Sequence, residues 1–182
     1  APRINVASRI DHATISFDLL TTQSAEEAAW ISERLDTMND ERKIAVEKII
    51  TTVDKNKECA GKDVIVAGDI NWHPGVLGIA ANKLLDKYNH PVFLWGKGAA
   101  EKVKGSCRSD GSINLVEFMG QLSKNTLSDF GGHALAGGFS IGKEGAEKFK
   151  DEVLALYKKF PRQKVENGIL YIDGKLSIDD IN

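Results

Sequence analysis

The sequence has little cysteine. Only Cys59 and Cys107 occur among its 182 residues. Two cysteines are too few for a disulfide framework or for a zinc site built from four cysteine ligands, and they fit a reducing compartment. We therefore expect two free thiols and a cytoplasmic location.

Long apolar stretches are also absent. No run approaches the roughly 18 consecutive apolar residues of a membrane-spanning helix. The first twenty residues lack the charged start and apolar stretch of a signal peptide. From this pattern we expect no membrane association.

An excess of positive charge is the third absence. Lysine and arginine number 24 against 26 acidic residues, which gives a formal net charge of -2. The molecule as a whole therefore has no positive field that would hold nucleic acid. Any site for an anion must be local.

The remaining composition is that of a folded domain. Hydrophobic residues make up 42% and charged residues 27% of the chain, which excludes disorder and a fibrous build. From Asp63 onward, short apolar runs alternate with helical patterns, which predicts an α/β fold. We expect strands at 64–67, 91–95, 102–108 and 138–141, and helices at 75–88, 113–122 and 144–160.

A long helix is predicted near the amino end. Ser24 and Glu27 form a capping box, and the apolar stripe that follows extends to about residue 56, interrupted by Arg42. At about 1.5 Å per residue such a helix is roughly 45 Å long. It is either an ordinary amphipathic packing helix or a helix that bridges two lobes. Residues 56–62 are the best candidate for a linker.

A glycine-rich segment surrounds one histidine. Residues 130–138 contain four glycines, two alanines and His133. Backbone N–H groups without side-chain cover can approach an anion closely, and the imidazole adds a donor. The alternative is a tight strand–helix–strand crossing in which small residues only permit close packing.

A basic segment precedes it. Residues 97–108 contain four basic residues against Glu101 alone. On a strand, Lys102, Lys104, Ser106 and Arg108 share one face, and such a row suits phosphate groups. The alternative is a solvated edge strand protected by its lysines.

Two further segments are weaker candidates. Residues 71–76 follow a strand and open a helix, where α/β folds often present ligand groups, but His73 there is equally a helix cap and Trp72 a lid on the core. Residues 3–9 place Arg3, Asn5 and Arg9 in a turn that could hold phosphate or could be solvated. The four histidines have no metal-ligand spacing, and neither a nucleophile elbow nor a phosphate loop occurs.

Together these motifs resemble the RecJ family of single-strand-specific exonucleases within the DHH phosphoesterase superfamily. The amino end resembles the family's Pro-Arg-x-Asn-Ala-x-Gly-Arg segment, and Leu35-x3-Asn39-x2-Arg42 matches its linking helix. Three motifs are similar to the DHH-associated substrate-binding domain: Trp72-His-Pro-Gly-Val-x-Gly78, Lys104-Gly-Ser-x-Arg-Ser109 and Gly131-Gly-His-x2-Ala-Gly137.

The resemblance implies a division of the chain. Residues 1–22 would be the tail end of a catalytic domain, 23–60 the linking helix, and 62–160 a DHH-associated domain with a mixed sheet flanked by helices. Residues 161–182 would form a linker and the first strand of an oligonucleotide-binding domain. The sequence contains no Asp-His-His signature. We therefore expect the chain to be a piece of a longer protein, with Mn²⁺ or Mg²⁺ held in a catalytic domain outside it and no metal bound by these residues.

The resemblance also implies an activity: hydrolysis of single-stranded DNA from the 5′ end, with two divalent metals activating water. No catalytic residue is expected in this piece. DNA repair or replication proteins are further expected partners. The implied substrate-binding residues are Asn5, Arg9, His73, Ser106, Arg108, Gly131, Gly132, His133 and Gly137.

Two departures from the family pattern concern small residues. Ser8 replaces a usual glycine, and Cys107 a usual alanine or glycine, so each is expected to tighten its loop. Two alternative functions remain, of which the first shares the Gly-Gly-His motif, although the long helix and the Trp-His-Pro-Gly loop favour RecJ. One is a DHH-type phosphodiesterase for short oligonucleotides or cyclic dinucleotides, and the other is a non-catalytic module associated with replication. An anion-binding domain of unrelated type fits less well.

The missing metal-binding motifs generate the first prediction. The purified chain alone should not release nucleotides from 5′-labelled single-stranded DNA in Mn²⁺ or Mg²⁺, because it supplies no carboxylate cluster of the family's kind. Product release would be followed on denaturing gels, with a metal-dependent exonuclease as the positive control. Robust metal-dependent release by highly purified chain would contradict the prediction.

Overall fold

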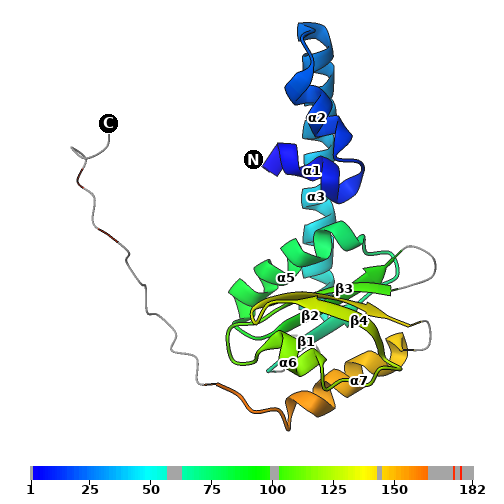
Figure 1. The fold of residues 1–182 in the computed structure, drawn as a ribbon, viewed down its shortest axis with the longest axis vertical. Coiled ribbons are helices and arrows are strands. Elements are labelled where there is room, and N and C mark those ends of the chain that lie inside the picture. The colour runs from blue at the N-terminus through cyan, green and yellow to red at the C-terminus, as the bar shows by residue number, and fades with distance from the viewer. Residues whose placement is uncertain are drawn as a thin grey trace.

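The computed structural model describes residues 2–56, 63–98, 103–142 and 145–163, together with Gly174 and Ser177. A helical arm stands above a sheet that is flanked by further helices (Figure 1). The helices are α1 (Pro2–Ile10), α2 (Thr14–Thr21), α3 (Ala25–Lys55), α5 (Pro74–Tyr88), α6 (Leu115–Met119) and α7 (Ala146–Tyr157). The strands are β1 (Ile65–Gly68), β2 (Val92–Lys97), β3 (Val103–Arg108), β4 (Leu127–Gly132) and β5 (Ala136–Ile141).

The five strands form one mixed sheet in the order β1-β2-β3-β5-β4. Strands β1 and β2 are parallel, and the other three pairs are antiparallel. This arrangement confirms the predicted α/β class with a mixed sheet and flanking helices. Strand β4 was not predicted, because its glycines and polar residues carry no apolar alternation. It pairs with β5 as a hairpin, so the strand–helix–strand alternative for residues 130–138 is wrong.

The sheet separates two hydrophobic clusters. On one face, β2 and β5 contribute Phe93 and Phe139, which pack against Phe149 of α7 and Phe118 of α6. On the other face, Val92 and Leu94 pack with α5 and the carboxyl-terminal half of α3. Because successive strand residues point to opposite faces, β2 serves both clusters and is buried along most of its length.

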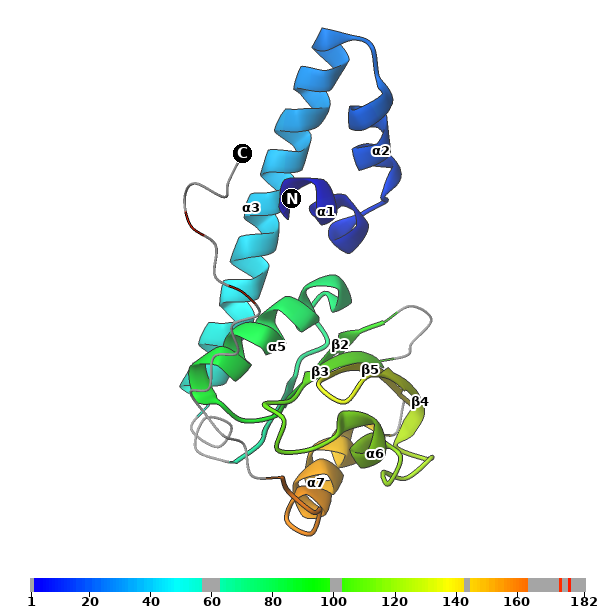
Figure 2. The ribbon, with the colours of Figure 1, turned by 60° about the vertical axis from the view of Figure 1, so that its left-hand side comes forward.

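Helix α3 extends beyond the sheet. Ser24 caps it by accepting a hydrogen bond from the Glu27 N–H at 3.2 Å, as the capping box predicts. Its amino-terminal half buries Ile31, Leu35 and Met38 against Val6 and Ala7 of α1 and lies away from the strands (Figure 2). Its carboxyl-terminal half belongs to the cluster beneath α5. The helix therefore joins two separate cores, as the bridging interpretation expects.

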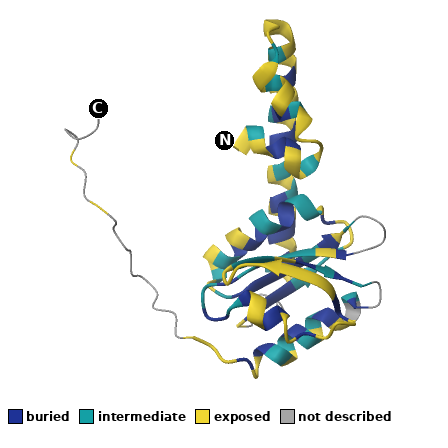
Figure 3. Cartoon of the chain, in the orientation of Figure 1, coloured by how far each residue is buried: buried dark blue, intermediate teal, exposed yellow. Residues whose placement is uncertain are grey.

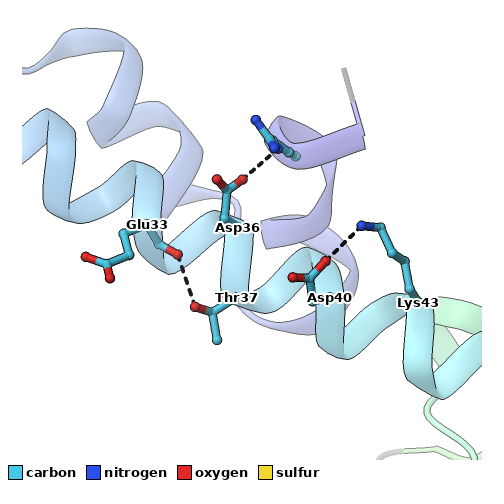
Figure 4. A network of polar contacts seen from close by, with 6 residues as sticks. Glu33, Asp36, Thr37, Asp40 and Lys43 are labelled. Carbon is cyan, nitrogen blue, oxygen red and sulfur yellow. Dashed lines mark hydrogen bonds and ion pairs between the residues drawn. The ribbon is translucent and has the colours of Figure 1, made fainter.

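An ion pair joins α1 to this arm. The Arg3 guanidinium pairs with Asp36 of α3 at 2.6 Å, while Lys43 and Asp40 form a 2.8 Å pair within α3 itself (Figure 4). Residues 2–10 are helical, so the turn expected around Arg3 and Arg9 is wrong. Val6 and Ala7 are fully buried against α3. A helix places these two apolar side chains on the same side of the segment, where α3 can cover both.

Other expectations differ in extent. The helix predicted at 113–122 is only Leu115–Met119, capped by Asn114. The strand expected within residues 161–182 lies outside the described residues apart from Gly174 and Ser177, and so does the thiol of Cys59. Cys107 is a free, buried thiol, as expected. In the part of the chain that the structure describes, no helix combines the length and apolar character needed to cross a membrane.

A polar clamp joins the ends of α3 and α5. Lys87 Nζ donates a hydrogen bond of 2.6 Å to Asp54 Oδ2, and the Tyr88 hydroxyl donates one of 2.6 Å to Asp54 Oδ1. The hydrogen bond from Lys87, followed by that from Tyr88, lowers the pKa of Asp54 below its ordinary value of 3.8. The clamp therefore favours the charged carboxylate in the folded state.

This clamp predicts a pH-dependent loss on replacement. Because the folded-state pKa of Asp54 is depressed, its contribution to stability is present above pH 3.8 and fades as the pH falls through the folded-state pKa. Asp54→Asn should lower the free energy of unfolding in urea at pH 6 but not near pH 2. Asp86→Asn, an exposed carboxylate on α5, is the matched control. An equal effect of Asp54→Asn at both pH values would contradict the clamp.

The two cores of α3 predict separable effects. Leu35 is 1% exposed against α1, whereas Ile44 on the same helix is 70% exposed. Leu35→Ala should weaken the packing of α1 by about 2–5 kcal/mol, the usual cost of a buried leucine. Hydrogen exchange of the α1 amides should accelerate at least about tenfold while β2 amides are unchanged. Ile44→Ala should leave the exchange of the α1 and β2 amides unchanged. Equal acceleration of α1 and β2 exchange in Leu35→Ala would mean that the two cores unfold as a single cooperative unit.

Candidate nucleic-acid interface

Strand β3 presents a polar row at the centre of the sheet. It lies between β2 and β5, so the edge-strand interpretation is wrong. Val103 and Cys107 are buried on the face of the aromatic cluster, while Lys104, Ser106 and Arg108 alternate with them on the other face. The period of two thus produces the predicted shared face. Lys102 lies outside the described residues.

Ser106 and Arg108 contact each other directly. Arg108 Nη1 donates to Ser106 Oγ at 3.2 Å and to the Cys107 carbonyl at 2.8 Å. The Ser106 hydroxyl in turn lies 3.5 Å from the Gly137 carbonyl of β5. The guanidinium is therefore held in place along one edge, which leaves its other N–H donors for a ligand.

Helix α5 approaches this pair closely at Gly78. A Cβ added there would lie 3.0 Å from Arg108 Nη2 and 3.2 Å from Ser106 Oγ. Alanine there would require these two side chains to shift by a few tenths of an ångström, and a longer side chain would displace them further. Gly78 belongs to the Trp-His-Pro-Gly-Val-x-Gly motif but was not among the predicted site residues. A glycine within a helix lowers the stability of that helix. This cost was the signal in the sequence that Gly78 is needed for a close contact.

The opposite face of β3 is a dry core. Cys107 Sγ lies 3.8 Å from Met119 Sδ, and burial raises the pKa of this thiol to about 12. The side chain is thus neutral near pH 7 and takes no part in the polar face. It sits in a regular strand, and Ser8 sits on α1, where its hydroxyl donates to the Asn5 carbonyl at 3.0 Å. The expectation that each residue would tighten a loop is therefore wrong, because neither residue lies in a loop.

The glycine-rich hairpin forms an open floor beside β3. Gly138 pairs with Ser106 across β3 and β5, and Gly131 pairs with Gly138 across β4 and β5. Strand β4 is exposed along most of its length (Figure 3). Both glycines are exposed, and a Cβ added to Gly131 would meet nothing within 4 Å. Gly137 alternates to the other face, where an added Cβ would lie 3.0 Å from Met119 and 3.1 Å from Cys107. Gly138 was not among the predicted site residues, although the period of two indicates its face.

The tip of this hairpin carries His133. Gly132 adopts a φ of 139°, which lets the chain turn there without a side-chain clash. The tip is held by three backbone hydrogen bonds: from His133 N–H to the Ala136 carbonyl, from Ser109 N–H to the Leu135 carbonyl, and from Leu115 N–H to the Ala134 carbonyl. Since Ala136 pairs with Arg108, the exposed imidazole lies near the end of β3 that carries the guanidinium.

In the loop before α5, His73 caps the helix and Trp72 covers the core, as the sequence allowed. His73 Nδ1 accepts a hydrogen bond from the Gly75 N–H at 3.2 Å, and Trp72 is buried in the cluster beneath α5. Accepting at Nδ1 leaves the Nε2 position of the exposed ring available as a donor. One residue therefore caps the helix and still presents a polar group to solvent.

Helix α1 brings Arg9 to the start of α5. A Cβ added to Gly75 would lie 1.9 Å from the Arg9 carbonyl oxygen, so the two backbones touch. The Asn5 and Arg9 side chains are exposed. No hydrogen bond joins them among residues 2–56. The Arg9 carbonyl and the His73 ring both lie beside Gly75.

Metal ligands are not clustered in the parts of the chain that the structure describes. No group of three histidine, cysteine or acidic side chains there could hold a metal ion. The structure thus gathers Ser106, Arg108, Gly131 and His133 around β3 and the hairpin, and Arg9 with His73 around the start of α5. Basic and small residues, rather than a catalytic cluster, characterise this face.

Comparisons with known proteins agree with this arrangement. The DHHA1 domain model matches residues 61–159. The single-stranded-DNA-specific exonuclease RecJ of Bacillus subtilis is 35% identical over 150 residues, covering 79% of this chain and 19% of its own length. The RecJ of Haemophilus influenzae is 28% identical over 192 residues, covering 100% of this chain and 33% of its own length.

Solved structures give the same result. The crystal structure of RecJ with Mg²⁺ from Thermus thermophilus superposes with a TM-score of 0.76 at 34% identity, covering 88% of this chain and 25% of that one. A structure of exonuclease RecJ bound to manganese gives a TM-score of 0.77, covering 88% of this chain and 40% of that chain.

These matches confirm the RecJ resemblance inferred from the motifs. The chain spans about a fifth to a third of the length of the curated relatives it matches. The matched residues 61–159 contain the sheet, α5 and the glycine-rich hairpin that make up the interface. The chain belongs to the DHHA1 domain family.

Proposed function

We propose that this chain is the substrate-binding part of a RecJ-type exonuclease that degrades single-stranded DNA from the 5′ end in the cytoplasm. The observation that carries the proposal is the Ser106–Arg108 pair, held on the open face of the sheet beside a floor of glycines. The similarity to exonucleases named RecJ supports the substrate class.

The chemistry of this face suits a phosphodiester. A guanidinium offers planar, charged donors, and a neighbouring hydroxyl adds a further donor to a phosphate oxygen. The glycines of β5 cannot bind an anion through their backbone N–H groups in the way that the sequence suggested. Strand β5 pairs on both sides, so its ladder uses its N–H groups, and Gly138 instead offers a flat surface for a sugar or base.

The other predicted residues receive proposed roles in the same path. His133, Gly131 and Gly132 would contact the nucleotide nearest the 5′ phosphate, with Gly137 supporting Ser106 from β5 through its carbonyl group. Arg9, supported by Asn5, and His73 would contact phosphates near the start of α5.

The proposed division of the protein follows the family resemblance. Residues 1–22 complete a catalytic domain, 23–60 link it to the substrate-binding domain at 62–160, and 161–182 lead into an oligonucleotide-binding domain. Mn²⁺ or Mg²⁺ would be held by the catalytic domain, as related RecJ structures with these ions suggest. DNA repair or replication proteins are the proposed protein partners.

Replacement of Arg108 tests the phosphate site. Arg108→Ala should weaken binding of a fluorescent, 5′-phosphorylated single strand by about 1–3 kcal/mol, the scale of a charge-assisted hydrogen bond. Wild-type affinity should itself be only about micromolar or poorer, because the net charge of -2 gives little long-range attraction. Binding would be measured by fluorescence anisotropy at fixed ionic strength.

A matched control removes one charge elsewhere. Lys158→Ala changes the net charge equally but lies after α7, away from β3, and should change affinity much less. Arg108→Lys keeps the charge without the planar fork and should give an intermediate affinity. Equal affinities for the wild type and Arg108→Ala, with both proteins folded by circular dichroism, would move the phosphate site elsewhere.

A further inference from the structure

A cavity lies at the other end of β3 from Arg108. It has a volume of about 530 Å³ and opens between the loop before α5 and the ends of β2 and β3. His73 is the one residue of its lining with a role in the proposed function. Its lining residues are Ile70, Asn71, Trp72, His73, Pro74, Lys97, Gly98 and Lys104.

The wall formed by the loop is fixed in position. A Cβ added to Gly96 would lie 2.2 Å from the Trp72 carbonyl oxygen, so this loop rests directly on β2. The Asp69 carboxylate accepts hydrogen bonds from the Asn71 backbone and side-chain N–H groups at 2.8 and 2.9 Å. The buried Trp72 side chain anchors the loop in the core. A preformed wall favours binding because little order is lost when a ligand enters.

The lining combines two kinds of chemistry. Lys104 lies on the face of Arg108, whereas Lys97 pairs with Val103 on the opposite face and borders the cavity from the end of β2. Both lysines are exposed, and neither forms an ion pair with a carboxylate among residues 63–98 or 103–142. Ile70, on the loop, is 53% exposed although it is a large apolar residue. Ammonium groups attract a phosphate, and an apolar surface beside them suits the face of a sugar or base.

The position of the cavity relates it to the Ser106–Arg108 pair. Lys104 shares the face of Arg108 and precedes it by four residues in β3, which corresponds to about 13 Å along a strand. A nucleic-acid strand that lies along β3 would therefore reach the cavity only after extending beyond the nucleotide held at Arg108. A ligand of one or two nucleotides would not fill both places.

We infer that this cavity is a second nucleotide subsite, which takes a phosphate and its base several ångströms downstream of the 5′ phosphate at Arg108. The inference rests on the proposed function, since it takes single-stranded DNA as the ligand. Lys97 and Lys104 bind the backbone, and Ile70 contacts the sugar or base. The subsite makes affinity depend on the length of the strand.

Strand length provides the test. The probes are 5′-phosphorylated oligothymidylates of two and of six nucleotides, titrated by fluorescence anisotropy over a range of salt concentrations. The double variant Lys97→Ala/Lys104→Ala should bind the hexanucleotide about tenfold more weakly, and the dinucleotide within about twofold of the wild type. The slope of log K against log salt should fall by about 1.4 for the hexanucleotide, at about 0.7 for each phosphate that is no longer neutralised.

A control double variant separates local contacts from net charge. Lys83→Ala/Lys124→Ala removes two exposed lysines from α5 and from the turn before β4, and should match the wild type on both probes. Ile70→Asn should weaken hexanucleotide binding without changing the salt slope. Equal hexanucleotide affinities for the Lys97/Lys104 variant and the control variant would overturn the subsite.

The same titrations distinguish failure of the subsite from failure of the proposed function. Arg108→Ala should weaken both probes if the 5′ phosphate binds there. If Arg108→Ala changes neither probe while the Lys97/Lys104 variant weakens the hexanucleotide, the subsite stands and the phosphate site at Arg108 is wrong. If the wild type binds neither probe at millimolar concentration, both are overturned.

Discussion

The close approach of α5 to the sheet is the constraint on which the rest of this structure depends. The loop before the helix lies against β2 because Gly96 has no side chain, since an added Cβ would meet the Trp72 carbonyl oxygen at 2.2 Å. Gly78 leaves room for the Ser106–Arg108 pair, which an added Cβ would meet at 3.2 and 3.0 Å. A side chain at Gly96 would push the loop away from the sheet, and one at Gly78 would shift the guanidinium.

A second consequence of this packing is that one side of the sheet remains open. Helix α5 covers β2 and part of β3, but β5 and β4 extend past it, and their exposed positions on that side include Gly131, Gly138 and Asp129. The other side is filled by α6, α7 and a set of aromatic rings. The aromatic cluster stabilises the sheet, so the open side can consist of small and polar residues that contribute little packing energy themselves. In β3, β4 and β5 the aromatic packing and the proposed ligand-binding surface therefore lie on opposite faces.

Several elements follow from local sequence because local forces form them. The capping box at Ser24 starts α3, Pro74 lies in the first turn of α5, and the alternation in residues 103–108 puts Ser106 and Arg108 on one face. Strand β4 carries no such pattern, because it is held by pairing with β5 and is exposed along most of its length. The helix at Pro2–Ile10 was equally hidden, since α3 supplies the surface that buries Val6 and Ala7.

The sequence by itself determined the class of fold, the long helix, the polar row on β3 and the family resemblance, because periodicity, caps and motif spacing are local properties of the chain. Only the tertiary structure decided that β3 is central and that Gly78 lies against Arg108. Strand order and helix placement depend on contacts between residues far apart in sequence. Such contacts depend on the surfaces of two segments at once, so neither segment alone predicts them.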